Sequence, residues 1–170
     1  MAAHKFLKNN AGVITEEAAV DTSAGAGDAG KLIALDADGK VAANMMPSGV
    51  DIEVVSVTTS ENLTAGDFVN IWESTGAKAR KADATTTGKE ANGFVLASTT
   101  SGQSADVYLP GQVNTGRTGL TPGAMYWLDT TAGGIVATAP TGSGNAVQKI
   151  GRATSATAIV FSPSEPYVLV

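Results

Sequence analysis

The sequence predicts an all-β fold: a compact β-sandwich or barrel built from two similar β units and preceded by an extended N-terminal arm. Three observations lead to this prediction. Short runs rich in Val, Ile, Tyr and Phe recur about every ten residues after position 51, bounded by Gly, Asn, Asp, Ser or Pro. Part of this pattern repeats within the chain. Residues 1–50 lack the pattern altogether.

Residues 1–50 are the predicted arm. Their apolar residues come in short clusters between Gly, Ala, Asp and Asn, without the sustained period of a helix or a strand. Asp36, Ala37, Asp38 and Gly39 form a turn sequence in which Gly39 supplies a positive φ, so we expect a small hairpin or a tight bend over 31–41. An isolated arm cannot bury such clusters, and we expect them to contact the chain's own domain or, as the preferred interpretation, another chain. The candidate contact residues are Phe6, Leu7, Val13, Ile14, Leu32, Ile33, Leu35, Met45, Met46 and Pro47.

Residues 51–170 are the predicted β domain, and helix has little support there. The expected strands are 52–58, 68–72, 78–82, 93–98, 105–109, 125–128, 135–139, 147–153 and 157–161.

An internal similarity suggests two β units of four short strands each. Leu-Thr-x-Gly opens a strand at Leu63 and again at Leu120. An isolated small sheet is marginal in water, so the half-apolar faces of the two units are expected to cover one another. Trp72 and Trp127 are expected to pack in equivalent core positions, in preference to forming a carbohydrate-stacking face.

The last five residues are apolar, which predicts that they pack against protein. They either complete the domain's own sheet or augment the sheet of a neighbour. The candidate contact residues here are Tyr167, Val168 and Leu169.

Composition restricts the classes of partner. The 170 residues suit one domain, and the aromatic content of 5% with 20 Gly predicts a thin core that benefits from oligomerisation. The net charge of −5 argues against a nucleic-acid partner. No stretch approaches the length of a membrane span, and no Cys is present for disulfides, thiol chemistry or Cys-bound zinc.

Three motifs that suggest chemistry have simpler interpretations. Residues 25–30 fit G-x-G-x-x-G but lack the flanking strand and helix of a dinucleotide site, so a linker is expected. The Asp36 to Gly39 turn lacks the twelfth-position Glu of a calcium loop. His4 is the single His and lies in the polar arm, far in sequence from the Ser and Asp of the β region. The sequence therefore predicts no enzyme, no cofactor and no metal site.

The β region resembles the small head decoration (cement) and head-stabilising proteins of tailed bacteriophages. The residues that carry this resemblance are the Leu-Thr-x-Gly openings, 93–97 and 107–111. The stretch from Gly30 to Pro47 is similar to linker-like segments near the N-termini of many phage virion proteins, tail fibres included.

The resemblance implies a structural protein that binds the outer surface of an assembled capsid and stabilises it. It implies the major capsid protein and further copies of the chain as partners, with a trimer as the oligomer. The expected location is the outside of the virion, after synthesis in the cytoplasm of a bacterial host. The alternative is a tail-fibre, baseplate or receptor-binding module whose β domain contacts a host glycan.

Overall fold

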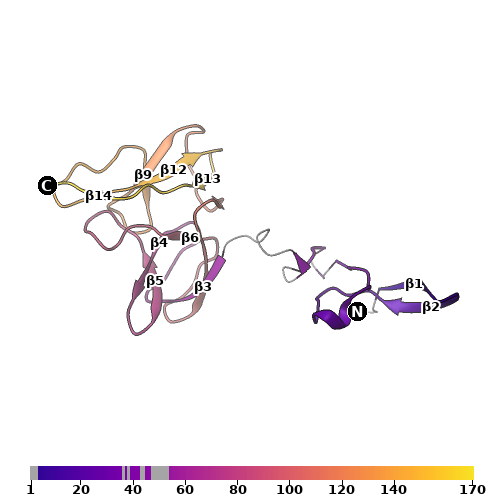
Figure 1. Ribbon diagram of the computed structural model, residues 1–170. Coiled ribbons are helices and arrows are strands. Elements are labelled where there is room, and N and C mark those ends of the chain that lie inside the picture. The colour runs from indigo at the N-terminus through magenta and orange to yellow at the C-terminus, as the bar shows by residue number, and fades with distance from the viewer. Residues whose placement is uncertain (1–3, 36, 38, 43–44, 47–53) are drawn as a thin grey trace. The chain divides into compact units, whose positions relative to one another are not determined.

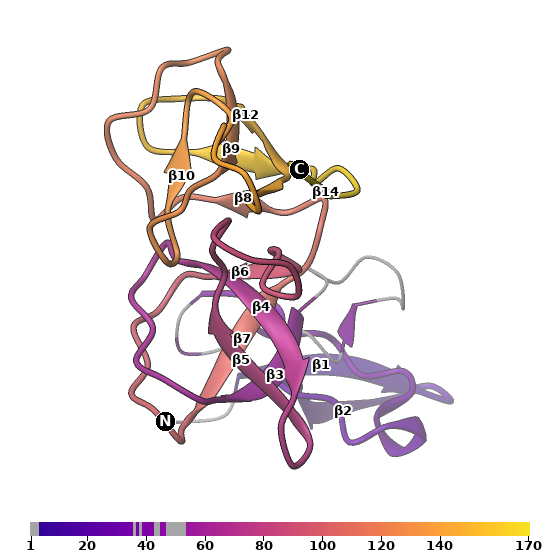
Figure 2. The ribbon, with the colours of Figure 1, turned by 90° about the vertical axis from the view of Figure 1, so that its left-hand side faces the viewer.

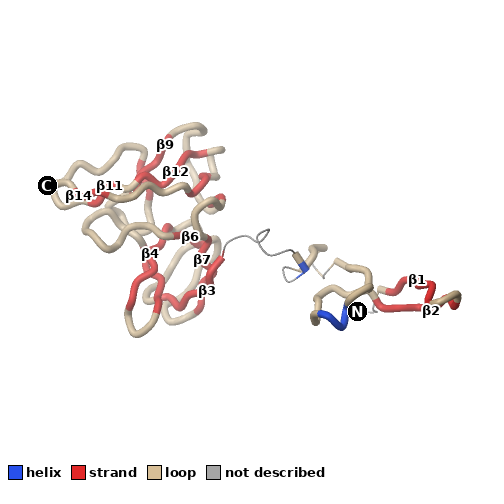
Figure 3. Tube along the Cα trace, viewed as in Figure 1, coloured by secondary structure: helices blue, strands red, loops and turns tan. Residues whose placement is uncertain are grey.

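The computed structural model describes residues 4–35, 37, 39–42, 45–46 and 54–170 (Figure 1). The chain divides into two compact units, Met1–Asp51 (unit 1) and Ile52–Val170 (unit 2). The predicted all-β class is confirmed, with 39% of residues in strands and 3% helical (Figure 3). Pro47 and the predicted start of the first domain strand at 52 and 53 lie outside the described residues.

Unit 1 contains a β-hairpin that the sequence pattern did not predict. Strand β1 (Lys5–Asn10) pairs antiparallel with β2 (Val13–Ala18). The two residues between them, Ala11 and Gly12, have φ of 52° and 92°, which is the backbone of a type I′ turn. The prediction missed the hairpin because apolar and charged side chains alternate on both faces, so no apolar face of period two is visible.

The segment after the hairpin folds back beside it. Val20 forms a parallel bridge with Ile33, and the Val20 N–H donates to Leu32 O at 2.9 Å. Within the expected linker at 25–30, three residues form a short 3-10 helix, η1 (Ala26–Asp28). The described part of the predicted 31–41 hairpin contains only that bridge at Ile33, and Gly39 has the predicted positive φ, 74°.

Unit 2 begins with a closed five-stranded barrel. Its strands are β3 (Val54–Thr59), β4 (Phe68–Glu73), β5 (Ala77–Lys81), β6 (Gly93–Val95) and β7 (Ser104–Tyr108). They pair in the order β3-β5-β4-β6-β7, and the β7–β3 pairing closes the circle. All neighbours are antiparallel except β3 and β5, which are parallel.

A second five-stranded sheet follows. It consists of β8 (Val113–Asn114), β9 (Met125–Leu128), β10 (Ile135–Val136), β12 (Lys149–Ala153) and β13 (Ile159–Phe161). These strands pair antiparallel in the order β10-β9-β12-β13-β8. A separate ribbon joins β11 (Ala146–Val147) to β14 (Tyr167–Val168). Figure 2 shows the second sheet stacked on one end of the barrel.

Unit 2 contains two hydrophobic clusters, and some of its strands contribute side chains to both. On β4, Phe68 joins the cluster that the barrel shares with the second sheet, whereas the next residue, Val69, points to the barrel interior. Phe94 and Val95 on β6 divide in the same way. The Phe68 and Phe161 ring centroids lie 5.4 Å apart. These barrel strands are therefore buried on both faces, which their continuous apolar runs reflect.

The prediction that Trp72 and Trp127 pack in the core is wrong, because both are only half-buried and neither joins a cluster. On β9, Tyr126 and Leu128 face the core, so alternation turns Trp127 to the other face. The Trp72 ring lies under the Arg80 guanidinium, 4.5 Å from ring centroid to Cζ.

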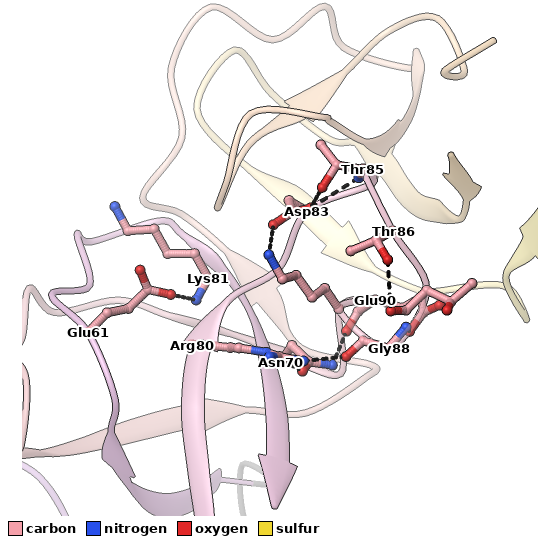
Figure 4. Close-up of polar contacts among 11 residues, drawn as sticks. Glu61, Asn70, Arg80, Lys81, Asp83, Thr85, Thr86, Gly88 and Glu90 are labelled. Carbon is pink, nitrogen blue, oxygen red and sulfur yellow. Dashed lines mark hydrogen bonds and ion pairs between the residues drawn. The ribbon is translucent and has the colours of Figure 1, made fainter. Parts of the chain in front are cut away.

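A polar loop after β5 is tied to the barrel by side chains (Figure 4). Asn70 donates from Nδ2 to Glu90 O at 2.7 Å and accepts at Oδ1 from Arg80 Nε at 3.0 Å. Within the loop, Lys89 Nζ lies 3.1 Å from Asp83 Oδ2. The buried polar groups of this region are thus paired, and the loop serves to close the shared core.

Candidate interaction surface

The described residues of unit 1 include no buried side chain, although many are apolar. A lone two-stranded hairpin is marginal in water, and it needs further strands or a packing partner for stability. Unit 1 is therefore the part of the described chain whose stability would gain most from a packing partner.

One face of the hairpin carries two strongly exposed apolar side chains, Leu7 and Ile14. Cross-strand partners share a face, and the register places Leu7 opposite Glu16 and Asn9 opposite Ile14. Leu7 is 75% exposed and Ile14 is 61% exposed. We call this side, with Lys5, Leu7, Asn9, Ile14, Glu16 and Ala18, the Leu7 face.

Two ion pairs cross the hairpin, one on each face. Lys5 Nζ lies 2.8 Å from Glu16 Oε2 on the Leu7 face, and Lys8 Nζ lies 3.2 Å from Glu17 Oε2 on the opposite face. All four side chains are solvent-accessible, so each pair contributes little to stability on its own. Both Lys lie on β1 and both Glu lie on β2, so the two strands of the hairpin carry opposite charges.

The returning segment forms an apolar groove with the start of β1. His4, Phe6, Leu32, Ile33 and Leu35 are among the residues that line a cavity of about 390 Å³. The side chains of Leu32, Ile33 and Leu35 are each more than half exposed. Fully burying a side chain of this kind yields about 1.5–3 kcal/mol, so a partner that fills the groove gains substantial free energy.

A second hollow lies beside η1 and has a charged rim. Val20, Ile33 and Met45 contribute its apolar lining, and Asp28 and Lys31 its ion pair, with Nζ 2.9 Å from Oδ1. The hydrogen bond from Lys31, followed by that from the Ala24 N–H, lowers the pKa of Asp28. The same hydrogen bond raises the pKa of Lys31. The pair thus stays ionised and holds the turn of η1 in place.

The structure brings together some of the predicted contact residues and separates others. Phe6 shares the groove with Leu32, Ile33 and Leu35, whereas Met45 lines the second hollow. Val13 lies on the face opposite Leu7 and Ile14. Met46 is exposed, and so is Val41, which the sequence reasoning missed because it counted Val41 only as part of a turn.

The C-terminal contact residues pair with their own unit. Strand β14 pairs with β11, and the Leu169 N–H donates to Asn145 O at 3.0 Å. Tyr167 remains 60% exposed and Val168 41% exposed, while Leu169 is half-buried. The segment completes a ribbon of its own domain and still presents apolar surface to solvent.

The described residues of this surface form no metal-ligand cluster. Among the described residues, no three His, Asp or Glu side chains gather closely enough to hold a metal ion. His4 lines the groove beside Lys5 and Phe6, with no Ser or Asp among the groove's residues. No helix within the described ranges is long and apolar enough to span a membrane.

Comparison with known proteins adds no family assignment. No family model, no curated protein and no solved structure matches the chain.

Proposed function

We propose that this chain is a structural, non-enzymatic protein of the bacteriophage virion that binds the outer surface of the capsid and stabilises it. The single observation that supports this function best is the composition of unit 1: it presents an apolar groove and an apolar sheet face and has no buried described side chain of its own. Unit 2, in contrast, has a complete core. In this function, unit 1 attaches the chain to the capsid and unit 2 covers the capsid surface.

The proposed partners are the major capsid protein and other copies of the chain, with a trimer as the assembly. The groove that includes Leu32, Ile33 and Leu35 is the contact to the capsid in this proposal. An arm contact repeated over a shell adds its free energy at every position, so a modest contact per copy suffices to stabilise the particle. The protein is made in the cytoplasm of the bacterial host and remains on the outside of the finished virion.

The two sheets of unit 2 are proposed to be two copies of one β unit. Each sheet pairs its five strands in the same relative order, with β10-β9-β12-β13-β8 matching β5-β4-β6-β7-β3. Corresponding strands also pair at a glycine in both sheets. Val69 on β4 pairs with Gly93 on β6, and Tyr126 on β9 pairs with Gly151 on β12. The units differ in closure, since β3 pairs with β5 but β8 does not pair with β10.

Co-sedimentation with purified phage heads that lack the protein tests the proposed function. The full chain should sediment with heads, and the variant Leu32→Ser, Ile33→Ser, Leu35→Ser should remain in the supernatant. Val113→Ser, which changes an exposed residue of unit 2, is the matched control and should bind as the parent does. Failure of the parent chain to bind heads would refute the proposal.

The alternative is a tail-fibre, baseplate or receptor-binding module, and one observation favours it. Trp72 and Trp127 are part-exposed, which leaves aromatic surface available for stacking against a sugar ring. Gold-labelled antibody on virions separates the two functions: label over the head supports decoration, and label on the tail supports the alternative. A glycan-array signal that disappears in Trp127→Ala would identify the ligand class.

A further inference from the structure

Along Lys5–Asn10 and Val13–Ala18, the two edges of the unit 1 hairpin have no further strand partner in the described part of the chain; the returning segment bridges the chain only at Val20, beyond the end of β2. The Ala19 N–H donates to His4 O at 2.8 Å, so His4 and Ala19 are a hydrogen-bonded pair at the open end of the ladder. Hydrogen-bonded and non-hydrogen-bonded pairs alternate along an antiparallel ladder. The next pair, Lys5 with Ala18, is therefore non-hydrogen-bonded, and the two types alternate from there to the turn.

This alternation determines which backbone groups point away from the hairpin. They are the N–H and C=O groups of the non-hydrogen-bonded pairs: Lys5, Leu7 and Asn9 on β1, and Ile14, Glu16 and Ala18 on β2. Each strand thus presents an outward row of donors and acceptors, the arrangement that accepts another strand. These residues are also the members of the Leu7 face, so an added strand extends that face.

The two edges carry opposite charges. The β1 edge has Lys5 and Lys8, and the β2 edge has Glu16 and Glu17. Within one chain these residues already form the ion pairs Lys5–Glu16 and Lys8–Glu17. A strand with the sequence of β1 is therefore the electrostatic complement of the β2 edge, and the chain itself supplies such a strand.

We propose that the outer edge of β1 in one copy of this chain pairs antiparallel with the outer edge of β2 in a second copy. The register is that of the hairpin itself, with Leu7 opposite Glu16 and Asn9 opposite Ile14. In this register the outward groups of both strands meet as hydrogen-bonded pairs. Each Lys5 then lies between the Glu16 of its own chain and the Glu16 of its neighbour.

The same register gathers the apolar side chains. Leu7 of one copy lies on the same face as Ile14 of the next, so the Leu7 faces join into one apolar stripe across the copies.

Because the two edges differ, the contact is heterologous and forms a ring when the sheet closes on itself. The barrel of unit 2 closes with five strands; two hairpins supply four strands and three supply six. Three copies are therefore expected.

This inference rests on the self-association proposed above and assigns it a surface. Its first test is the variant Glu16→Pro in the full chain, measured by analytical ultracentrifugation without capsids. Proline removes an outward N–H that the hairpin itself does not use and places a ring at the β2 edge. Glu16→Thr is the matched control, because it removes the same charge but keeps the N–H and a good strand former.

The expected masses are three chains for the parent and for Glu16→Thr, and one chain for Glu16→Pro. A Glu16→Pro chain that assembles like the parent overturns the proposal, as does a monomeric parent.

Charge exchange provides a second, independent test. One double variant combines Lys5→Glu with Lys8→Glu, and the other combines Glu16→Lys with Glu17→Lys. Each gives both edges the same sign of charge and should be monomeric. The fourfold variant that combines them restores opposite edges and should assemble like the parent. Double variants that assemble as well as the parent contradict the proposal. Neither test uses heads, so a chain that forms rings but does not bind heads contradicts only capsid decoration.

Discussion

Gln148 and Ala91 are joined by two hydrogen bonds that imitate the pairing of adjacent strands. The Ala91 N–H donates to Gln148 Oε1 at 2.8 Å, and Gln148 Nε2 donates to Ala91 O at 3.0 Å. Both residues are buried. One side-chain amide thereby satisfies two backbone groups between the barrel and the second sheet, where no strand pairing reaches.

Replacing Gln148 with Leu should destabilise unit 2 by about 2–4 kcal/mol. The substitution leaves the N–H and C=O of Ala91 buried without partners, and each unsatisfied group costs about 1–3 kcal/mol. Urea unfolding followed by the fluorescence of Trp72 and Trp127 measures the change. Gln103 is exposed, so Gln103→Ala is the control and should change stability little. A loss of the same size in Gln103→Ala would contradict the stabilising role of the Gln148–Ala91 hydrogen bonds.

Gly66→Ala should be much more damaging than Gly88→Ala. Both glycines have positive φ, 90° and 83°, so both variants incur a conformational penalty of about 1–2 kcal/mol. A Cβ on Gly66 would also lie 2.3 Å from Gly116 O, whereas a Cβ on Gly88 would meet nothing within 4 Å. We expect an additional loss of about 1–3 kcal/mol for Gly66→Ala in thermal unfolding. Equal losses would show that the Gly66–Gly116 approach can relax.

Thr75→Gly should stabilise unit 2 by about 0.5–1 kcal/mol. Thr75 has a φ of 56° in the turn between β4 and β5, a conformation that disfavours a β-branched residue. Glycine adopts it without the steric penalty. Ser74→Gly is the control in the same turn, and because the φ of Ser74 is not positive it should lower stability. A decrease in the melting temperature of Thr75→Gly would contradict the prediction.

The stability of unit 2 should fall on acidification because of Asp83. Burial acts to raise the pKa of this carboxyl, but hydrogen bonds from Thr85 and Lys89 outweigh it and hold the pKa below its ordinary value. A lowered folded-state pKa gives stability that is present above the unfolded pKa of about 3.9 and is lost as the pH falls through the folded pKa. Asp83→Asn should flatten this decline in unfolding measured across that range, and an unchanged decline would contradict the prediction.

The sequence predicted unit 2 better than unit 1, for physical reasons that single strands illustrate. Each of the nine predicted strands overlaps an observed one, because continuous apolar runs such as Phe68-Val69 face a core on either side. Strand β8 has two residues of which only Val113 is apolar, so it contains no apolar run that predicts a strand. The hairpin of β1 and β2 was missed because the Ala11-Gly12 turn lacks the Asn-Gly signal.

The candidate surface was predictable as a set of residues but not as a shape. Apolar clusters in a Gly-rich and Ala-rich segment identified Leu7, Ile14 and Leu32 directly. Which of them share a face depends on the register of β1 against β2, and the sequence contains no marker of that register. The half-buried position of Trp127 was misjudged because an aromatic residue was assigned to the core by type, without counting the alternation from Tyr126 and Leu128.

The closure of the barrel by its first and last strands has a consequence for synthesis on the ribosome. Val54 pairs with Tyr108 and Thr58 with Ser104, so most of β3 has no strand partner until the chain through Tyr108 has left the exit tunnel. Pairings this distant in sequence form slowly, since a long loop must close first. A nascent chain halted before Tyr108 would expose an open sheet edge, so this stage of translation carries a risk of aggregation.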